Sequence, residues 1–121
     1  MIKTALSFDD VLLVPQYSEI KSRKDIEIRQ NLRAVGDFSL PIIASPMDTI
    51  TGEGMVCAMD TAGGLGILHR YNSIDEQAKM AMDIASANHV VGAAIGIGED
   101  CIERSLTLAR AGVSFLCIDV A

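Results

Sequence analysis

The residues of this sequence that could bind a ligand directly follow short apolar stretches. They form four polar or glycine-containing groups, at residues 45–49, 69–71 and 96–100 and at Asp119. A carboxylate such as that of Asp119 can accept two hydrogen bonds from a ribose diol, or it can cap the turn that follows. Together the groups predict a ligand-binding rim, with ordinary strand-to-helix turns as the alternative.

Two features of these groups each allow two interpretations. Gly96-Ile-Gly98 matches only the first part of the G-x-G-x-x-G pattern of dinucleotide- and phosphate-binding loops, because position 101 is Cys and not glycine. We therefore interpret it as a tight turn before a helix. His69 is of the residue type that carries protons, but its charged form is disfavoured beside Arg70. We interpret it as a positioned hydrogen-bonding group.

The three cysteines, Cys57, Cys101 and Cys117, predict reduced thiols. Their number is odd, their spacing is wide and their neighbours are apolar, a pattern typical of cytoplasmic proteins. No pair has the spacing of metal ligands, and the sequence has only two histidines, so we expect no metal site. We predict a cytoplasmic localisation.

The charge balance argues against nucleic-acid and membrane partners. Ten Lys and Arg residues stand against sixteen Asp and Glu residues, which gives a net charge of −6. Binding to nucleic acid or to an anionic membrane surface needs clustered positive charge. No stretch approaches the roughly 18 apolar residues of a membrane span. A small anionic ligand held by backbone amides stays compatible with this composition.

From Leu40 onward one unit repeats, made of an apolar strand, a turn, an amphipathic helix and a short connection. We predict strands at residues 41–44, 65–68, 90–95 and 115–118, whose starts lie 24, 25 and 25 residues apart. We predict helices near residues 52–61, 74–86 and 101–111. Ser73-Ile-Asp-Glu76 has the sequence of a capping box, in which serine and glutamate satisfy the first free amides of a helix.

Strands that are apolar along nearly their whole length predict a parallel sheet covered by helices. This pattern indicates an α/β fold, either a (β/α)8 TIM barrel or a doubly wound sheet. A barrel needs at least about 200 residues, so residues 40–121 would form its first half. Another chain or the remainder of a longer protein would complete it, and we favour the longer protein. We expect residues 1–39 to be an N-terminal extension with a hairpin, whose first strand is the alternating segment 25–29.

Five segments, taken in order, resemble the opening of the family that contains IMP dehydrogenase and GMP reductase. The resemblance covers essentially the whole chain, and its most specific part is Ser-Pro-Met-Asp-Thr. The segments are Leu6-Ser-Phe-Asp-Asp-Val-Leu-Leu-Val-Pro15, Ala44-Ser-Pro-Met-Asp-Thr49, Gly63-Gly-Leu-Gly-Ile-Leu-His69, Val91-Gly-Ala-Ala-Ile-Gly96 and Ala111-Gly-Val-Ser-Phe-Leu-Cys-Ile-Asp119.

The resemblance implies a (β/α)8 barrel that assembles as a homotetramer and binds a purine mononucleotide with NAD or NADPH. It implies that Ser45 and Met47 lie beside the nucleotide, with the hydroxyl toward ribose or phosphate and the thioether against the base. It implies that Asp119 faces the nicotinamide ribose and that Arg70 contacts the dinucleotide. The family's catalytic cysteine lies in a later glycine-rich loop, so we assign no catalytic residue here and expect the 121-residue chain alone to be inactive.

The motifs divide between the two members of this family. Our prediction is an IMP dehydrogenase that converts IMP to XMP with NAD, and the alternative is a GMP reductase that converts GMP to IMP with NADPH. Only a few residues separate Ile84 from Val90, so we predict that the regulatory CBS domain inserted at this point in many dehydrogenases is absent. A second alternative is a non-catalytic, nucleotide-binding half-barrel.

Overall fold

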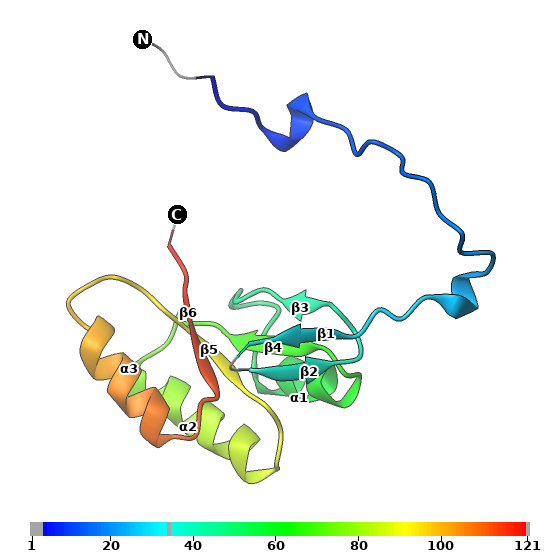
Figure 1. Cartoon of the computed structure of the whole chain (residues 1–121). Coiled ribbons are helices and arrows are strands. Elements are labelled where there is room, and N and C mark those ends of the chain that lie inside the picture. The colour runs from blue at the N-terminus through cyan, green and yellow to red at the C-terminus, as the bar shows by residue number, and fades with distance from the viewer. Residues whose placement is uncertain (1–3, 34, 121) are drawn as a thin grey trace.

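The computed structural model describes residues 4–33 and 35–120 of the chain and contains a four-stranded parallel sheet (Figure 1). The strand order is β3-β4-β5-β6, so each strand pairs with the next one along the sequence. The strands are β3 (Ile43–Ala44), β4 (Leu65–Leu68), β5 (Gly92–Ile95) and β6 (Phe115–Ile118). The connecting helices are α1 (Glu53–Thr61), α2 (Ile74–Ser86) and α3 (Cys101–Arg110). The predicted α/β class with a parallel sheet is confirmed.

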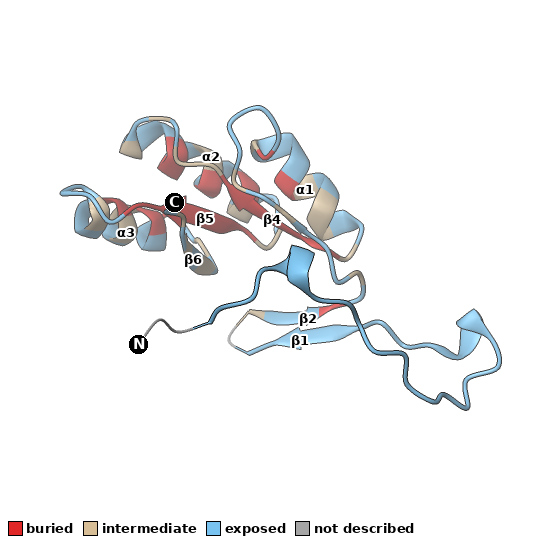
Figure 2. Cartoon of the chain, turned by 90° about the horizontal axis from the view of Figure 1, so that it is seen from above, coloured by how far each residue is buried: buried red, intermediate tan, exposed pale blue. Residues whose placement is uncertain are grey.

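The apolar core lies between the sheet and the three helices. Every residue of β4 and β5 is buried (Figure 2), which explains why these strands have no polar alternation. One cluster joins Val56 of α1, Ile84 of α2 and Leu108 of α3 to residues of both central strands. All three helices therefore pack against the same sheet, and the two central strands lie within the core.

The ends of the helices follow the capping signals in the sequence. The Ser73 hydroxyl accepts from the Glu76 amide at 3.2 Å, and the Glu76 carboxylate accepts from the Ser73 amide at 2.9 Å. The bond from the Ser73 amide, with a second bond from the Ser73 hydroxyl at 2.8 Å, lowers the pKa of the Glu76 carboxyl. The reciprocal bonds between Ser73 and Glu76 confirm the capping box. Gly112 follows α3 in the left-handed conformation, with φ of 91°, which glycine adopts without steric strain.

One hydrogen-bonded pair of side chains lies at the amino-terminal end of the sheet. His89 Nδ1 in the turn before β5 lies 2.7 Å from Asp60 Oδ2 near the end of α1. Asn88 precedes it with φ of 64°, a conformation that asparagine tolerates. The pair therefore ties the connection between α2 and β5 to the first helix.

The N-terminal hairpin lies further along the chain than expected. Strand β1 (Gln30–Leu32) pairs in antiparallel fashion with β2 (Gly36–Phe38). The strand predicted at residues 25–29 is wrong, because Arg23–Asp25 forms a short 3-10 helix and the residues after it pair with no strand. Ile26 and Ile28 alternate in the sequence but are about half exposed. Alternation gives a strand only where a second strand offers free backbone groups.

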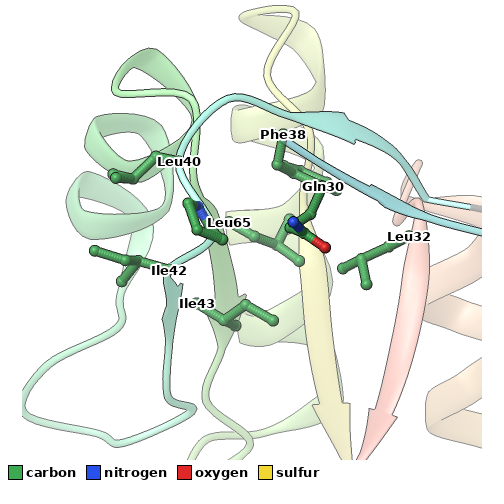
Figure 3. Close-up of a pocket in the computed structure, with 8 residues that line it drawn as sticks. Gln30, Leu32, Phe38, Leu40, Ile42, Ile43 and Leu65 are labelled. Atoms are coloured by element: carbon green, nitrogen blue, oxygen red, sulfur yellow. The ribbon is translucent and has the colours of Figure 1, made fainter. Parts of the chain in front are cut away.

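The hairpin covers the amino-terminal ends of β3 and β4. Between them lies an apolar cavity of about 190 Å³ (Figure 3). Residues 4–29 extend away from this region (Figure 1), and their large apolar side chains, such as Phe8 and Leu13, are almost fully exposed. No helix within residues 4–33 and 35–120 is long and apolar enough to cross a membrane.

Candidate functional site

A cavity of about 350 Å³ with both polar and apolar lining residues lies where the strands end. Its lining combines the loop after β3 with residues that follow β4 and β6. Because all the strands are parallel, their carboxyl ends lie at one edge of the sheet, where ligands bind in folds of this type. The lining residues are Ser45, Pro46, Met47, Asp48, Tyr71 and Asp119.

The loop that contributes Ser45 and Met47 is held by a buried threonine. Thr51 is fully buried, and its hydroxyl donates to the Ser45 carbonyl. Its amide donates to the Met47 carbonyl at 2.9 Å. Both site residues remain accessible, and Met47 is 49% exposed. The loop therefore presents a hydroxyl and an apolar thioether side by side on a fixed backbone.

Arg70 and Asp119 form a pair across the sheet. The Arg70 Nε donates to the Asp119 backbone carbonyl at 3.2 Å and lies 3.6 Å from the carboxylate Oδ2. The Asp119 amide donates in turn to the Ile95 carbonyl at 2.9 Å. Both side chains are about one third exposed, so each can also contact a ligand. The carboxylate can accept from a diol, and the guanidinium offers further donors for phosphate.

Gly96 provides the space that this pair needs. A Cβ atom at position 96 would lie 3.3 Å from an Arg70 guanidinium nitrogen, which is a tight contact. A side chain at the end of β5 would displace the end of the Arg70 side chain by a few tenths of an ångström, so glycine favours the path of Arg70 over this strand toward β6. Here the glycine of the Gly96-Ile-Gly98 turn serves a close approach of side chain to backbone.

The residues on either side of Arg70, His69 and Tyr71, also contact each other. The Tyr71 amide donates to His69 Nδ1 at 3.3 Å, and their rings stack with centroids 6.4 Å apart. The Arg70 guanidinium carbon lies 5.5 Å from the Tyr71 ring centroid, within the range of a cation–π contact. His69 thus accepts a backbone hydrogen bond, and its interpretation as a positioned hydrogen-bonding group rather than a proton carrier stays a prediction.

The four residues singled out in the sequence come together at this edge. Ser45, Met47 and Asp119 line the cavity, and Arg70 contacts Asp119 beside it. Their roles toward a nucleotide remain predictions. Within residues 4–33 and 35–120, no group of three His, Cys, Asp or Glu side chains is placed to hold a metal ion. The arrangement offers binding groups for a sugar, a phosphate and an apolar ring face.

Sequence reasoning missed two residues that support the site, Gln77 and Arg104. Both are buried beneath the loops that carry Arg70 and Asp100. A signal was present, because Gln77 lies in helical phase with Ala81 and Ile84, a buried face of α2. A polar residue within such an apolar stripe usually has buried hydrogen-bond partners.

The apolar cavity under the hairpin is a poorer candidate. It lies at the opposite end of the strands, and Gln30 contributes the only polar side chain among its lining residues (Figure 3). A purine nucleotide carries charge and several hydrogen-bonding groups, which this lining would leave unpaired. The lining residues are Gln30, Leu32, Phe38, Leu40, Pro41, Ile42, Ile43 and Leu65.

Comparison with known proteins gives one consistent result. A protein-family model described as an IMP dehydrogenase / GMP reductase domain matches residues 5–121. An inosine-5'-monophosphate dehydrogenase of Korarchaeum cryptofilum is 41% identical over 120 residues, which cover 96% of this chain and 25% of that protein. One from Nitrosopumilus maritimus is 40% identical over 89 residues, covering 74% of this chain and 19% of that protein.

Relatives named GMP reductase have about the same sequence identity to this chain. A GMP reductase of Leishmania donovani is 42% identical over 82 residues, which cover 68% of this chain and 17% of that protein. The chain thus spans a quarter or less of the length of these curated relatives.

Proposed function

The chain belongs to the IMP dehydrogenase / GMP reductase family, and from this premise we propose that it forms the first half of a (β/α)8-barrel purine-nucleotide oxidoreductase. Residues 40–121 supply four strands of the barrel, and residues 1–39 are an N-terminal extension. No regulatory CBS domain is inserted between α2 and β5. The complete protein converts IMP to XMP with NAD as a cytoplasmic homotetramer. Catalysis itself belongs to residues outside this chain.

A single observation supports the proposal most directly. Ser45 and Asp119 follow β3 and β6, the two edge strands of the sheet, yet they line one cavity. Neighbouring strands lie about 4.8 Å apart, so in a flat sheet of four strands the edges would be about 14 Å apart. A sheet that curls brings these edges toward each other, as closure into a barrel requires.

We assign two parts of the site to two ligands. Ser45 and Met47 bind the purine mononucleotide, with the hydroxyl on ribose or phosphate and the thioether against the base. Asp119 accepts hydrogen bonds from the ribose of the cofactor, and Arg70 orients Asp119 and contacts the dinucleotide. The cofactor, when bound, accepts the hydride that the reaction removes. The Asp119 carboxylate and the Arg70 guanidinium suit cofactor binding because both are partly exposed and can form further hydrogen bonds with a ligand.

Ligand titrations followed by amide NMR spectra of the 121-residue chain test these assignments. We expect IMP to shift the signals of residues 45–49 and NAD to shift those of Arg70 and Asp119. Asp119→Asn should weaken NAD binding about tenfold or more, because a hydrogen bond to a charged group contributes about 1.5–3 kcal/mol. Asp75→Asn, at an exposed position of α2, is the matched control.

Two outcomes would contradict the proposal. One is that both nucleotides shift only signals far from the strand ends. The other is that Asp119→Asn and Asp75→Asn bind NAD equally well. The direction of the reaction requires the longer protein, assayed with IMP plus NAD against GMP plus NADPH. XMP formation is the expected result, and formation of IMP from GMP would identify the reductase.

A further inference from the structure

A buried arginine lies beneath the loops that surround the site. Arg104 in the first turns of α3 is only 8% exposed. Its Nε donates to Asp100 Oδ2 at 2.8 Å, and one terminal nitrogen donates to Gln77 Oε1 at 2.8 Å. Both terminal nitrogens lie 3.3 Å from the Asn72 carbonyl. The guanidinium therefore joins the loop before α2 to the loop before α3.

Gln77 extends this network to two strands. It is fully buried in α2, and its Nε2 donates to the His69 carbonyl at 3.1 Å and the Ala94 carbonyl at 2.9 Å. Its Oε1 accepts the hydrogen bond from Arg104, so both donors and the acceptor of its side-chain amide are used. One side chain thus connects the ends of β4 and β5 to the buried guanidinium.

The network holds both ends of a short segment that contains Arg70. Gln77 binds the carbonyl of His69, immediately before Arg70, and Arg104 binds the carbonyl of Asn72, two residues after it. Between these two anchors the Arg70 side chain reaches Asp119 on β6. The direction in which Arg70 leaves the backbone is therefore set by the two buried polar residues below it.

Packing alone does not require this arrangement. Burying a charged group is expensive, and apolar residues of similar volume often stabilise a core as well or better. The Arg104 bond also lowers the pKa of Asp100, so the pair remains ionised under ordinary conditions. The four hydrogen bonds of Arg104, one to Asp100, one to Gln77 and two to the Asn72 carbonyl, provide what an apolar residue cannot, a fixed loop geometry.

We infer that Gln77 and Arg104 are positioning residues, which hold the 69–72 segment so that Arg70 and Asp119 together form the cofactor half of the site. This inference rests on the proposed function for the identity of the ligand. The juxtaposition itself, of Arg104 with the Asn72 carbonyl and of Arg70 with Asp119, does not depend on it. The loop carrying Ser45 and Met47 is held from within by the hydroxyl and amide of Thr51, and one backbone bond of 3.3 Å, from the His69 amide to the Thr51 carbonyl, links it to the 69–72 segment, so it should respond less.

The test uses Arg104→Met in the 121-residue chain, with two readouts. The first is the protection of the Arg70 Nε–H from solvent exchange in NMR spectra, which its bond to Asp119 provides. The second is the pair of dissociation constants for NAD and for IMP. We expect Arg104→Met to abolish the protection and to raise the dissociation constant for NAD about tenfold, or about 1.4 kcal/mol. The constant for IMP should stay within about twofold, which corresponds to less than about 0.5 kcal/mol. Arg110→Met, at an exposed position of the same helix, should change neither readout.

A purely structural role predicts a different pattern. NAD and IMP would then weaken equally in parallel with a lower unfolding temperature, or the Arg70 protection would persist, and either result would overturn the inference. If Arg104→Met does not fold, Arg104→Lys and Gln77→Glu replace it. Glutamate keeps the acceptor for Arg104 but removes the donors to the His69 and Ala94 carbonyls, so it should release the 69–72 segment at its His69 end. Retained protection in both variants would overturn the inference.

The two proposals fail in distinguishable ways. Absence of NAD and IMP binding in the unsubstituted chain would count against the proposed function. The Arg70 protection would still report on the positioning role, because that readout needs no ligand.

Discussion

The close approach of α1 to β4 makes Gly66 sensitive to a single added methyl group. A Cβ atom there would lie 2.7 Å from the Cα of Val56 and 3.0 Å from its Cγ2. The first of these atoms is backbone, and Val56 is fully buried, so α1 as a whole would have to move. Overpacking of this kind costs about 1–3 kcal/mol. We expect about 3 kcal/mol for Gly66→Ala.

Urea unfolding followed by circular dichroism measures this effect. With an m-value of about 1.5 kcal/mol/M, a loss of about 3 kcal/mol lowers the midpoint by about 2 M. Gly54→Ala is the control, because it adds the same methyl group to α1 with no atom within 4 Å. It should raise stability by about 0.5 kcal/mol, since alanine favours helices. Equal midpoints for Gly66→Ala and the unsubstituted chain would refute the packing argument.

Three further predictions concern caps, turns and charge. Ser73→Ala should lower the free energy of unfolding by about 1 kcal/mol through loss of the N-cap of α2; an unchanged urea midpoint would show that the cap contributes nothing. Gly112→Ala should cost at least about 1 kcal/mol because its φ of 91° disfavours a side chain, and a crystal structure with unchanged φ and full stability would contradict this. Because Arg104 lowers the pKa of Asp100 from its ordinary value of 3.8, the stabilisation is complete above pH 3.8 and disappears as the pH falls through the lowered pKa. Thermal unfolding at pH 7 and pH 3 should therefore show a smaller acid-induced loss for Asp100→Asn than for the unsubstituted chain, and equal losses would refute this coupling.

Most of the sheet and its helices could be predicted because their signals are local. The predicted strands at residues 65–68 and 115–118 and the helix at 74–86 have the same bounds in the structure. The unbroken apolar runs indicated burial on both faces, and Ser73 marked the start of a helix. The hairpin was misplaced because pairing depends on a partner strand, which Ile26 and Ile28 do not have.

The site was predictable residue by residue but not as a set of contacts. Asp119 was indicated by its place after a strand, and Ser45 and Met47 by resemblance to the family. The bond between Arg70 and Asp119 joins residues 49 positions apart, and nothing local encodes it. The Arg70 side chain crosses β5 beside Gly96, and only the register of the neighbouring strands reveals this proximity.

The hydrogen-bonded pair of Asp60 and His89 lies at the end of the sheet opposite the candidate site. Thermal stability and ligand preference can therefore be varied at opposite ends of the sheet, because substitutions around Asp60 lie away from the Arg70–Asp119 pair. A designer who wants a more robust scaffold would vary the turns beneath the sheet. One who wants a different nucleotide would vary the loops above it, and the two sets of changes should combine almost additively.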